Sequence, residues 1–275
     1  MVDELTYDML DNVAPPFAPE CPEEVVTKLS RFYDPEEVRS CYAEILEAYQ
    51  EGILFSPDDY EKYANFAVAS PIKAMCLNIA HDCNLRCKYC FASTGDFGEG
   101  RKLMSYETGK KAVDFLLQNS GDRVNLEMDF FGGEPLMNWE VVKQIVAYAR
   151  SVEKQHSKNF RFTLTTNGML INDEVIEFAN REMSNVVLSL DGRREVHDAT
   201  RVDYAGHGSY DRIVPKFQKL VAARGGKGYY MRGTFTHRNP DFTKDVLHMA
   251  DLGFTELSME PVAAAPDDPM APTPA

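Results

Sequence analysis

Residues 81–91, HDCNLRCKYCF, place three cysteines, Cys83, Cys87 and Cys90, within eight residues. Three thiolates are one short of the closed four-ligand set of a structural zinc site. They are enough to hold three irons of a [4Fe–4S] cubane, whose fourth iron then stays open to another ligand. The x3 and x2 spacers let one loop wrap around such a cluster, so an iron–sulfur loop is the favoured interpretation.

Two other interpretations of these cysteines remain open. One is a zinc site with His81 or Asp82 as the fourth ligand, although both lie so close to Cys83 in the sequence that tetrahedral geometry is hard to reach. The other is a set of reduced cysteines that ligate nothing. The remaining cysteines are expected to be small buried hydrophobic side chains: Cys21, Cys41 and Cys76.

The composition is typical of a soluble globular protein. The chain has 275 residues, of which 44% are hydrophobic and 26% charged, and its formal net charge is -14. Nucleic-acid binding by phosphate neutralisation needs a basic surface, so the acidic balance argues against it. No apolar run reaches membrane-spanning length, and the acidic N-terminus lacks the features of a signal peptide. We therefore expect a cytoplasmic protein that binds neither nucleic acid nor a membrane.

From residue 72 onward, short apolar runs alternate with amphipathic segments of helical period. The predicted strands are 74–80, 125–131, 160–166, 185–190, 229–236 and 256–261. The predicted helices are 105–119, 138–154, 173–181, 209–224 and 241–252. Such alternation favours an α/β fold whose parallel strands are joined by right-handed crossovers.

The rest of the chain differs from this α/β region, which we place at residues 71–262. Residues 1–70 contain helical patterns, including a helix that Asp34 caps at its N-terminus, and predict a small helical unit. Residues 263–275 are rich in alanine and proline and predict a disordered tail.

Polar and glycine-rich loops follow directly after the predicted strands. The cysteines come after the first strand, and the later loops are 132–135 (GGEP), 165–168 (TTNG), 189–192 (SLDG) and 259–261 (MEP). Carboxyl ends of parallel strands meet at one rim, where α/β folds build their sites. We therefore expect these loops to form one site, with Glu260 as a further candidate on its rim.

The cysteine spacing, with Tyr89 just before Cys90, resembles the signature of the radical S-adenosylmethionine (SAM) superfamily. The resemblance covers about residues 72–262 and implies a partial (β/α)6 barrel of parallel strands. It also implies that the open iron of a [4Fe–4S] cluster binds SAM. Reductive cleavage of SAM would then give methionine and a 5′-deoxyadenosyl radical, which abstracts hydrogen from a substrate.

The resemblance assigns cofactor contacts to the other loops. Gly132, Gly133 and Glu134 would hold the methionine amino group, Thr166 would line the cofactor, Ser189 and Asp191 would contact the ribose, Arg201 the carboxylate and Tyr89 the adenine. Each has a plainer alternative, because tight turns, a solvated arginine and ordinary aromatic packing give the same residues.

Longer stretches narrow the resemblance to peptide maturases of the SPASM or twitch type. These are 74–100, 132–139 (GGEPLMNW), 165–168 and 189–198 (SLDGRREVHD). They are most similar to the maturases of "six cysteines in forty-five residues" (SCIFF) peptides, which install thioether crosslinks. This implies two partners, a cysteine-rich ribosomal precursor peptide and a low-potential electron donor of flavodoxin or ferredoxin type. Residues 1–70 resemble the helices of the winged-helix-like element that recognises the peptide.

One departure from these maturases is that no cysteine follows Cys90. The maturases carry auxiliary clusters in a cysteine-rich extension, so we expect a truncated chain that is catalytically incomplete for crosslinking. Other interpretations of the chain are an anaerobic sulfatase maturase or another radical peptide modifier, an electron-transfer iron–sulfur protein, a zinc-stabilised peptide-binding module, or a degenerate fragment.

Overall fold

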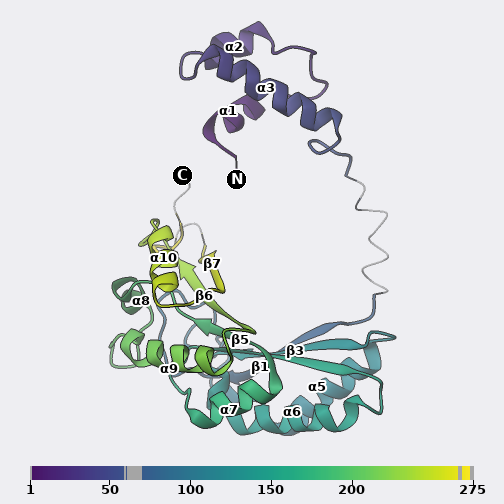
Figure 1. Cartoon of the computed structure of the whole chain (residues 1–275), viewed down its shortest axis with the longest axis vertical. Coiled ribbons are helices and arrows are strands. Elements are labelled where there is room, and N and C mark those ends of the chain that lie inside the picture. The colour runs from purple at the N-terminus through teal and green to yellow at the C-terminus, as the bar shows by residue number, and fades with distance from the viewer. Residues whose placement is uncertain (1, 59, 61–69, 266–267, 273–275) are drawn as a thin grey trace. The chain divides into compact units, whose positions relative to one another are not determined.

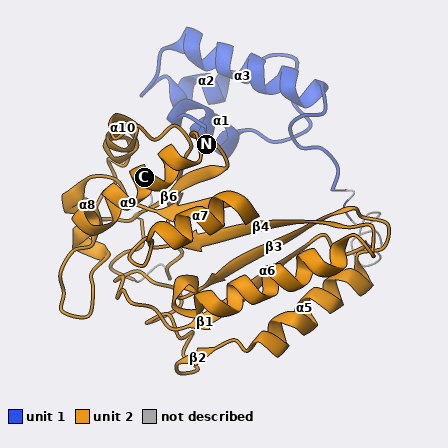
Figure 2. Ribbon diagram, turned by 60° about the horizontal axis from the view of Figure 1, so that its bottom comes forward, with its two compact units in different colours: residues 1–70 blue, residues 71–275 orange. Residues whose placement is uncertain are grey.

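The computed structural model describes residues 2–58, 60, 70–265 and 268–272, which belong to two compact units. Unit 1 is Met1–Ser70 and unit 2 is Pro71–Ala275 (Figure 2). In the part of the chain that the structure describes, no helix is both long and apolar enough to cross a membrane.

Unit 1 consists of helices: α1 (Glu4–Asn12), α2 (Glu23–Leu29) and α3 (Pro35–Gln50). Asp3 and Asp34 cap α1 and α3, because their carboxylates accept hydrogen bonds from the first free backbone N–H groups of these helices. One apolar cluster joins the three helices, and its members include Met9, Val26, Leu29, Val38, Tyr42 and Ile45. Cys21 and Cys41 are buried in this cluster, as predicted.

Unit 2 contains a seven-stranded sheet in the order β2-β1-β3-β4-β5-β6-β7. The strands are β1 (Ala74–His81), β2 (Lys102–Leu103), β3 (Asn125–Gly132), β4 (Asn159–Thr166), β5 (Met183–Ser189), β6 (Tyr229–Phe235) and β7 (Leu257–Pro261). The six predicted strands all exist and pair in parallel, which confirms the α/β partial-barrel fold. The antiparallel β2 was not predicted, since two residues are too few to show a period.

Helices connect the parallel strands and cover one side of the sheet. They are α5 (Tyr106–Asn119), η1 (Pro135–Asn138), α6 (Trp139–Glu153), α7 (Asp173–Glu182), α8 (Arg194–Thr200), α9 (Tyr210–Ala223) and α10 (Thr243–Asp251). Figure 1 shows α5, α6, α7 and α9 along one face of the sheet. The main core lies between these helices and the sheet, where Leu126, Met128 and Phe130 of β3 are fully buried. The short α8 and η1 were not predicted.

One expectation about unit 2 is wrong. Cys76 is exposed rather than buried, because Leu77 and Ile79 take the core side of β1 and alternate residues point to the opposite face. The predicted disordered tail lies partly outside the described residues, which omit 266–267 and 273–275. Within its described part, Met270 is buried and its carbonyl accepts a hydrogen bond of 3.1 Å from the backbone N–H of His237.

Candidate functional site

A cavity of about 430 Å³ opens at the carboxyl ends of the parallel strands. Its lining comes from the cysteine loop and from the ends of β3 to β7, so the predicted gathering of loops at one rim is seen in the structure. Nine of the eleven predicted site residues line it: Cys83, Cys87, Tyr89, Cys90, Gly132, Gly133, Thr166, Ser189 and Arg201. The other two, Glu134 and Asp191, are fully buried behind the wall.

The three thiols of the loop line this one cavity. Burial, with a smaller contribution from neighbouring thiols, raises the pKa of Cys83 to about 12 and that of Cys87 to about 11, although the Arg201 charge acts to lower the latter. Such thiols stay protonated unless a metal replaces their protons, as happens when cysteine ligates iron or zinc. Three such thiols on one cavity wall could act as ligands once a metal displaces their protons.

The arrangement favours a cluster over a single ion. Among the described residues, no three His, Cys, Asp or Glu side chains converge closely enough to hold one metal ion. A zinc ion needs its ligand atoms within about 2.0–2.3 Å, whereas a cubane offers a separate iron to each thiolate. Asp82, a candidate zinc ligand, instead accepts a hydrogen bond from the backbone of Cys83 and pairs with Arg101. The residues present thus fit a [4Fe–4S] cluster.

Two glycines let the end of β3 lie against the cysteine loop. A Cβ on Gly133 would lie 2.2 Å from the carbonyl oxygen of Asp82, and one on Gly132 would lie 2.5 Å from that of Ala80. Gly132 also has a φ of +123°, which other residues rarely adopt. Only glycine allows this backbone approach, which leaves both residues on the cavity wall.

Glu134 ties the ends of β3 and β4 together. Its carboxylate accepts hydrogen bonds from the hydroxyl of Thr166 at 2.8 Å and from the backbone N–H groups of Asn167 at 2.8 Å and Leu136 at 3.0 Å. Burial raises the pKa of Glu134 to about 7, although these donors act in the opposite direction. The carboxylate thus faces β4 and η1.

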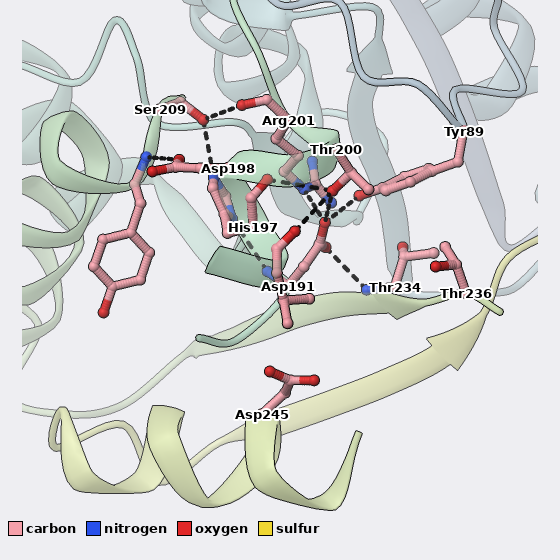
Figure 3. Close-up of polar contacts among 12 residues, drawn as sticks. Tyr89, Asp191, His197, Asp198, Thr200, Arg201, Ser209, Thr234, Thr236 and Asp245 are labelled. Carbon is pink, nitrogen blue, oxygen red and sulfur yellow. Dashed lines mark hydrogen bonds and ion pairs between the residues drawn. The ribbon is translucent and has the colours of Figure 1, made fainter. Parts of the chain in front are cut away.

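Asp191 likewise faces protein partners, as Figure 3 shows. One carboxylate oxygen accepts from the hydroxyl of Tyr89 at 2.6 Å and from Nε of Arg201 at 2.9 Å, and the other accepts from the backbone N–H of Thr234 at 3.0 Å. Burial acts to raise the pKa of Asp191, but the Arg201 guanidinium and the hydrogen bonds from Arg201 and Tyr89 act together in the opposite direction, and the pKa falls below its ordinary value. Ser189 lines the cavity, whereas Asp191 lies behind its wall.

Arg201 places an enclosed positive charge on the cavity wall. Its side chain is only 11% exposed and forms an ion pair with Asp191. Its pKa is well above the ordinary value because, against the effect of burial, Asp191 favours the charged form. A guanidinium with donors beyond those used by one carboxylate suits a second carboxylate from a ligand.

The opposite end of the cavity is built by β6 and β7. Arg232 and Glu260 both line it and form an ion pair at 2.5 Å, with side chains 40% and 46% exposed. Phe91 and Phe131 also lie on the wall, with nearly parallel rings whose centroids are 6.4 Å apart. The sequence singled out Glu260 as a rim residue but gave no signal for Arg232, Phe91 or Phe131.

Comparison with known proteins identifies the family to which these site residues belong. The profile of the radical SAM superfamily matches residues 77–231. The chain belongs to the radical SAM superfamily. Members of this superfamily use a [4Fe–4S] cluster and SAM, in agreement with the expectation from the cysteine loop.

Curated relatives lie in several branches of the superfamily. The chain is 25% identical over 187 residues to the radical SAM cyclopropyl synthase TigE of Paramaledivibacter caminithermalis, covering 62% of this chain and 38% of that protein. It is 29% identical over 145 residues to the cysteine-type anaerobic sulfatase-maturating enzyme of Clostridium novyi, covering 50% and 37%. It is 32% identical over 130 residues to an uncharacterized protein of Methanocaldococcus jannaschii, covering 47% and 42%. The chain thus spans less than half the length of these relatives.

A solved structure shares the fold. Native anSMEcpe with bound AdoMet superposes with a TM-score of 0.63 at 20% identity, covering 73% of this chain and 56% of that one. This likeness supports the barrel fold, and the profile match establishes the superfamily.

Proposed function

We propose that unit 2 is the SAM-cleaving core of a peptide-modifying radical SAM enzyme. One observation carries this proposal: three thiols, two close-packed glycines and an enclosed arginine line the same cavity at the rim of the barrel. Thiols suit iron, glycine backbone suits a closely approaching ligand, and a guanidinium suits a carboxylate.

The cavity wall suggests a place for each part of the cofactors. The [4Fe–4S] cluster would be ligated by Cys83, Cys87 and Cys90. The amino group of SAM would bind to the backbone of Gly132 and Gly133, and its carboxylate to Arg201. Thr166 and Ser189 would lie along the cofactor, and Tyr89 would flank the adenine. Glu134 and Asp191 would act from behind the wall, by holding Thr166 and Arg201. When bound, the cluster would supply the electron for reductive cleavage of SAM.

For the substrate, we propose a ribosomally made, cysteine-rich precursor peptide that is modified by thioether crosslinking. The resemblance of the loops to SCIFF maturases supports the crosslink, and the sulfatase-maturating relatives support a polypeptide substrate. The Arg232–Glu260 pair and the rings of Phe91 and Phe131, which all line the cavity, offer polar and aromatic contacts to a peptide. A flavodoxin or ferredoxin would supply the electron. Sulfatase-type maturation is the second candidate, on the strength of the named relatives.

The decisive experiment is anaerobic 5′-deoxyadenosine formation. The chain would be reconstituted with iron and sulfide, reduced, given SAM and compared with Cys87→Ala. We expect product from the wild type and none from the variant. A full cluster with no product would refute catalysis by this chain, and zinc retained in place of iron would refute the assignment of the cluster. With candidate peptides, mass spectrometry separates a thioether, which removes a pair of hydrogens, from oxidation of a cysteine to an aldehyde.

A further inference from the structure

We propose that His197 and Ser209 are positioning residues. They hold Arg201 at the cavity wall and keep the cysteine loop in place. The inference rests on the proposed function, because it concerns how the SAM site is kept in shape. Both side chains are fully buried, and neither lines the cavity in the described part of the chain. They act through the segment that ends α8.

The hydrogen positions in this network follow from the donors that surround it (Figure 3). The backbone N–H of Asp191 can only donate, so Nδ1 of His197 accepts this bond of 3.3 Å. The ring hydrogen of the neutral imidazole then lies on Nε2 and is donated to the hydroxyl oxygen of Ser209 at 2.9 Å. The hydroxyl of Ser209 in turn donates to the backbone carbonyl of Arg201 at 2.9 Å.

This order of donors requires a neutral histidine. A second hydrogen on Nδ1 would face the N–H of Asp191, and two donors cannot pair. Burial of the ring lowers the pKa of His197 to about 4, which keeps the imidazole neutral over the usual working range. The sequence offered no partner for His197, because Ser209 and Asp191 reach it only through the fold.

The network anchors Arg201 at both ends of the residue. Asp191 binds its guanidinium at Nε, and Ser209 binds its backbone carbonyl. The N–H of Arg201 also donates to the carbonyl of His197 at 2.8 Å. A buried ion pair is favourable only when its geometry is well fixed, so a backbone anchor beside it has a clear physical purpose.

The same segment is hydrogen-bonded to the cysteine loop. The N–H of Lys88 donates to the carbonyl of Thr200 at 3.0 Å, and the N–H of Arg86 donates to that of Val202 at 2.6 Å. These two donors flank Cys87 in the sequence. A shift of the 200–202 backbone would therefore move both the guanidinium of Arg201 and the proposed cluster ligand Cys87.

The test is Ser209→Ala, with Ser120→Ala as a matched control. Ser120 is also fully buried, and its hydroxyl donates to one backbone carbonyl, that of Leu117, at 3.0 Å. Ser209→Ala loses two buried hydrogen bonds, to His197 and to the Arg201 carbonyl, whereas Ser120→Ala loses one, so we expect a small decrease in thermal midpoint for both and a somewhat larger one for Ser209→Ala. After reconstitution, iron content, the Kd for SAM and the EPR spectrum of the reduced cluster with and without SAM would be measured.

We expect Ser209→Ala to keep its cluster but to bind SAM about tenfold more weakly, the change that corresponds to loss of the one hydrogen bond that anchors the Arg201 carbonyl. Its EPR response to SAM should also differ from that of the wild type, whereas Ser120→Ala should match the wild type in both respects. His197→Asn, which keeps an acceptor for the Asp191 N–H but does not reach Ser209, should weaken SAM binding as well, and it serves if Ser209→Ala does not fold.

Equal SAM affinity and equal spectra in Ser209→Ala and Ser120→Ala would overturn the positioning role while leaving the proposed function standing. A wild type that assembles a cluster but binds no SAM would overturn the proposed function, and the positioning inference with it.

Discussion

Arg201 and Asp191 form an enclosed ion pair, with Nε and Oδ2 2.9 Å apart and side chains only 11% and 1% exposed. The hydroxyl of Tyr89 shares the same carboxylate oxygen, so the pair joins the cysteine loop to the end of β5. Removing one partner of a buried pair leaves the other charge without compensation, which is far more destabilising than losing a surface pair.

Asp191→Asn should therefore lower the free energy of unfolding by about 3–5 kcal/mol, since the buried guanidinium of Arg201 loses its counter-charge. Urea unfolding of the apoprotein measures this. The matched control is Asp211→Asn, which breaks an ion pair with Arg194 whose side chains are 61% and 58% exposed. The control should cost less than about 1 kcal/mol. Equal losses in the two variants would show that the enclosure of the Arg201 pair has no energetic consequence.

The outline of this architecture follows from local patterns in the sequence, but the side-chain partners do not. Apolar runs placed six strands, and the loops after them gave nine residues of the cavity wall. The side chain of Asp191 is oriented by a hydrogen bond from Tyr89, which lies 102 positions away in the sequence. The side chain of Glu134 is oriented by one from Thr166, which lies 32 positions away. No short-range period carries that information, so both were expected on the wall and lie behind it.

Cys76 shows a signal that was present and missed. In β1 the apolar Leu77 and Ile79 alternate with Cys76 and Asn78, and the exposed asparagine marks the face of the strand opposite the core. Period-two alternation thus places Cys76 away from the core. His197 gave no comparable signal, because an isolated histidine in a short helix looks the same whether it is exposed or buried.

Glu134 should make stability depend on pH. Its pKa in the folded protein is about 7, above its ordinary value of 4.5, so the folded state binds this proton more tightly than the unfolded chain. The contribution is fully present below pH 4.5 and is lost as pH rises to about 7. A difference of this size corresponds to about 3 kcal/mol.

Urea unfolding of the apoprotein between pH 4.5 and 8 checks this against Glu134→Gln, which cannot titrate. His197, whose pKa is lowered to about 4, acts with the opposite sign, since its contribution is lost as pH falls through that value. It is present in both proteins, so the wild type minus Glu134→Gln isolates the carboxylate. Parallel pH profiles for the two proteins would exclude a raised pKa for Glu134.

Gly133→Ala should disturb the cysteine loop. The added methyl would lie 2.2 Å from the carbonyl oxygen of Asp82 and 2.8 Å from that of Gly95, and backbone atoms cannot move away cheaply. We expect the variant to retain less than about half the iron of the wild type after reconstitution, because the loop that carries Cys83 must shift. Gly253→Ala is the control, since its Cβ meets no described heavy atom within 4 Å and only its φ of +90° is strained. Full iron retention by Gly133→Ala would mean that the close approach does not shape the loop.

Alkylation of the apoprotein should distinguish the cysteines by burial. Burial raises the pKa of Cys83 to about 12 and of Cys87 to about 11, so almost none of either thiol is the reactive thiolate at pH 8. Cys76 is exposed on the face of β1 opposite the core, although partial burial raises its pKa as well. Iodoacetamide at pH 8, followed by peptide mass spectrometry, should label Cys76 well before Cys83 and Cys87. Urea should abolish the difference, because unfolding exposes all the thiols alike. Early labelling of Cys83 in the folded apoprotein would contradict the enclosed loop and would mean that the cysteine loop opens when no metal is bound.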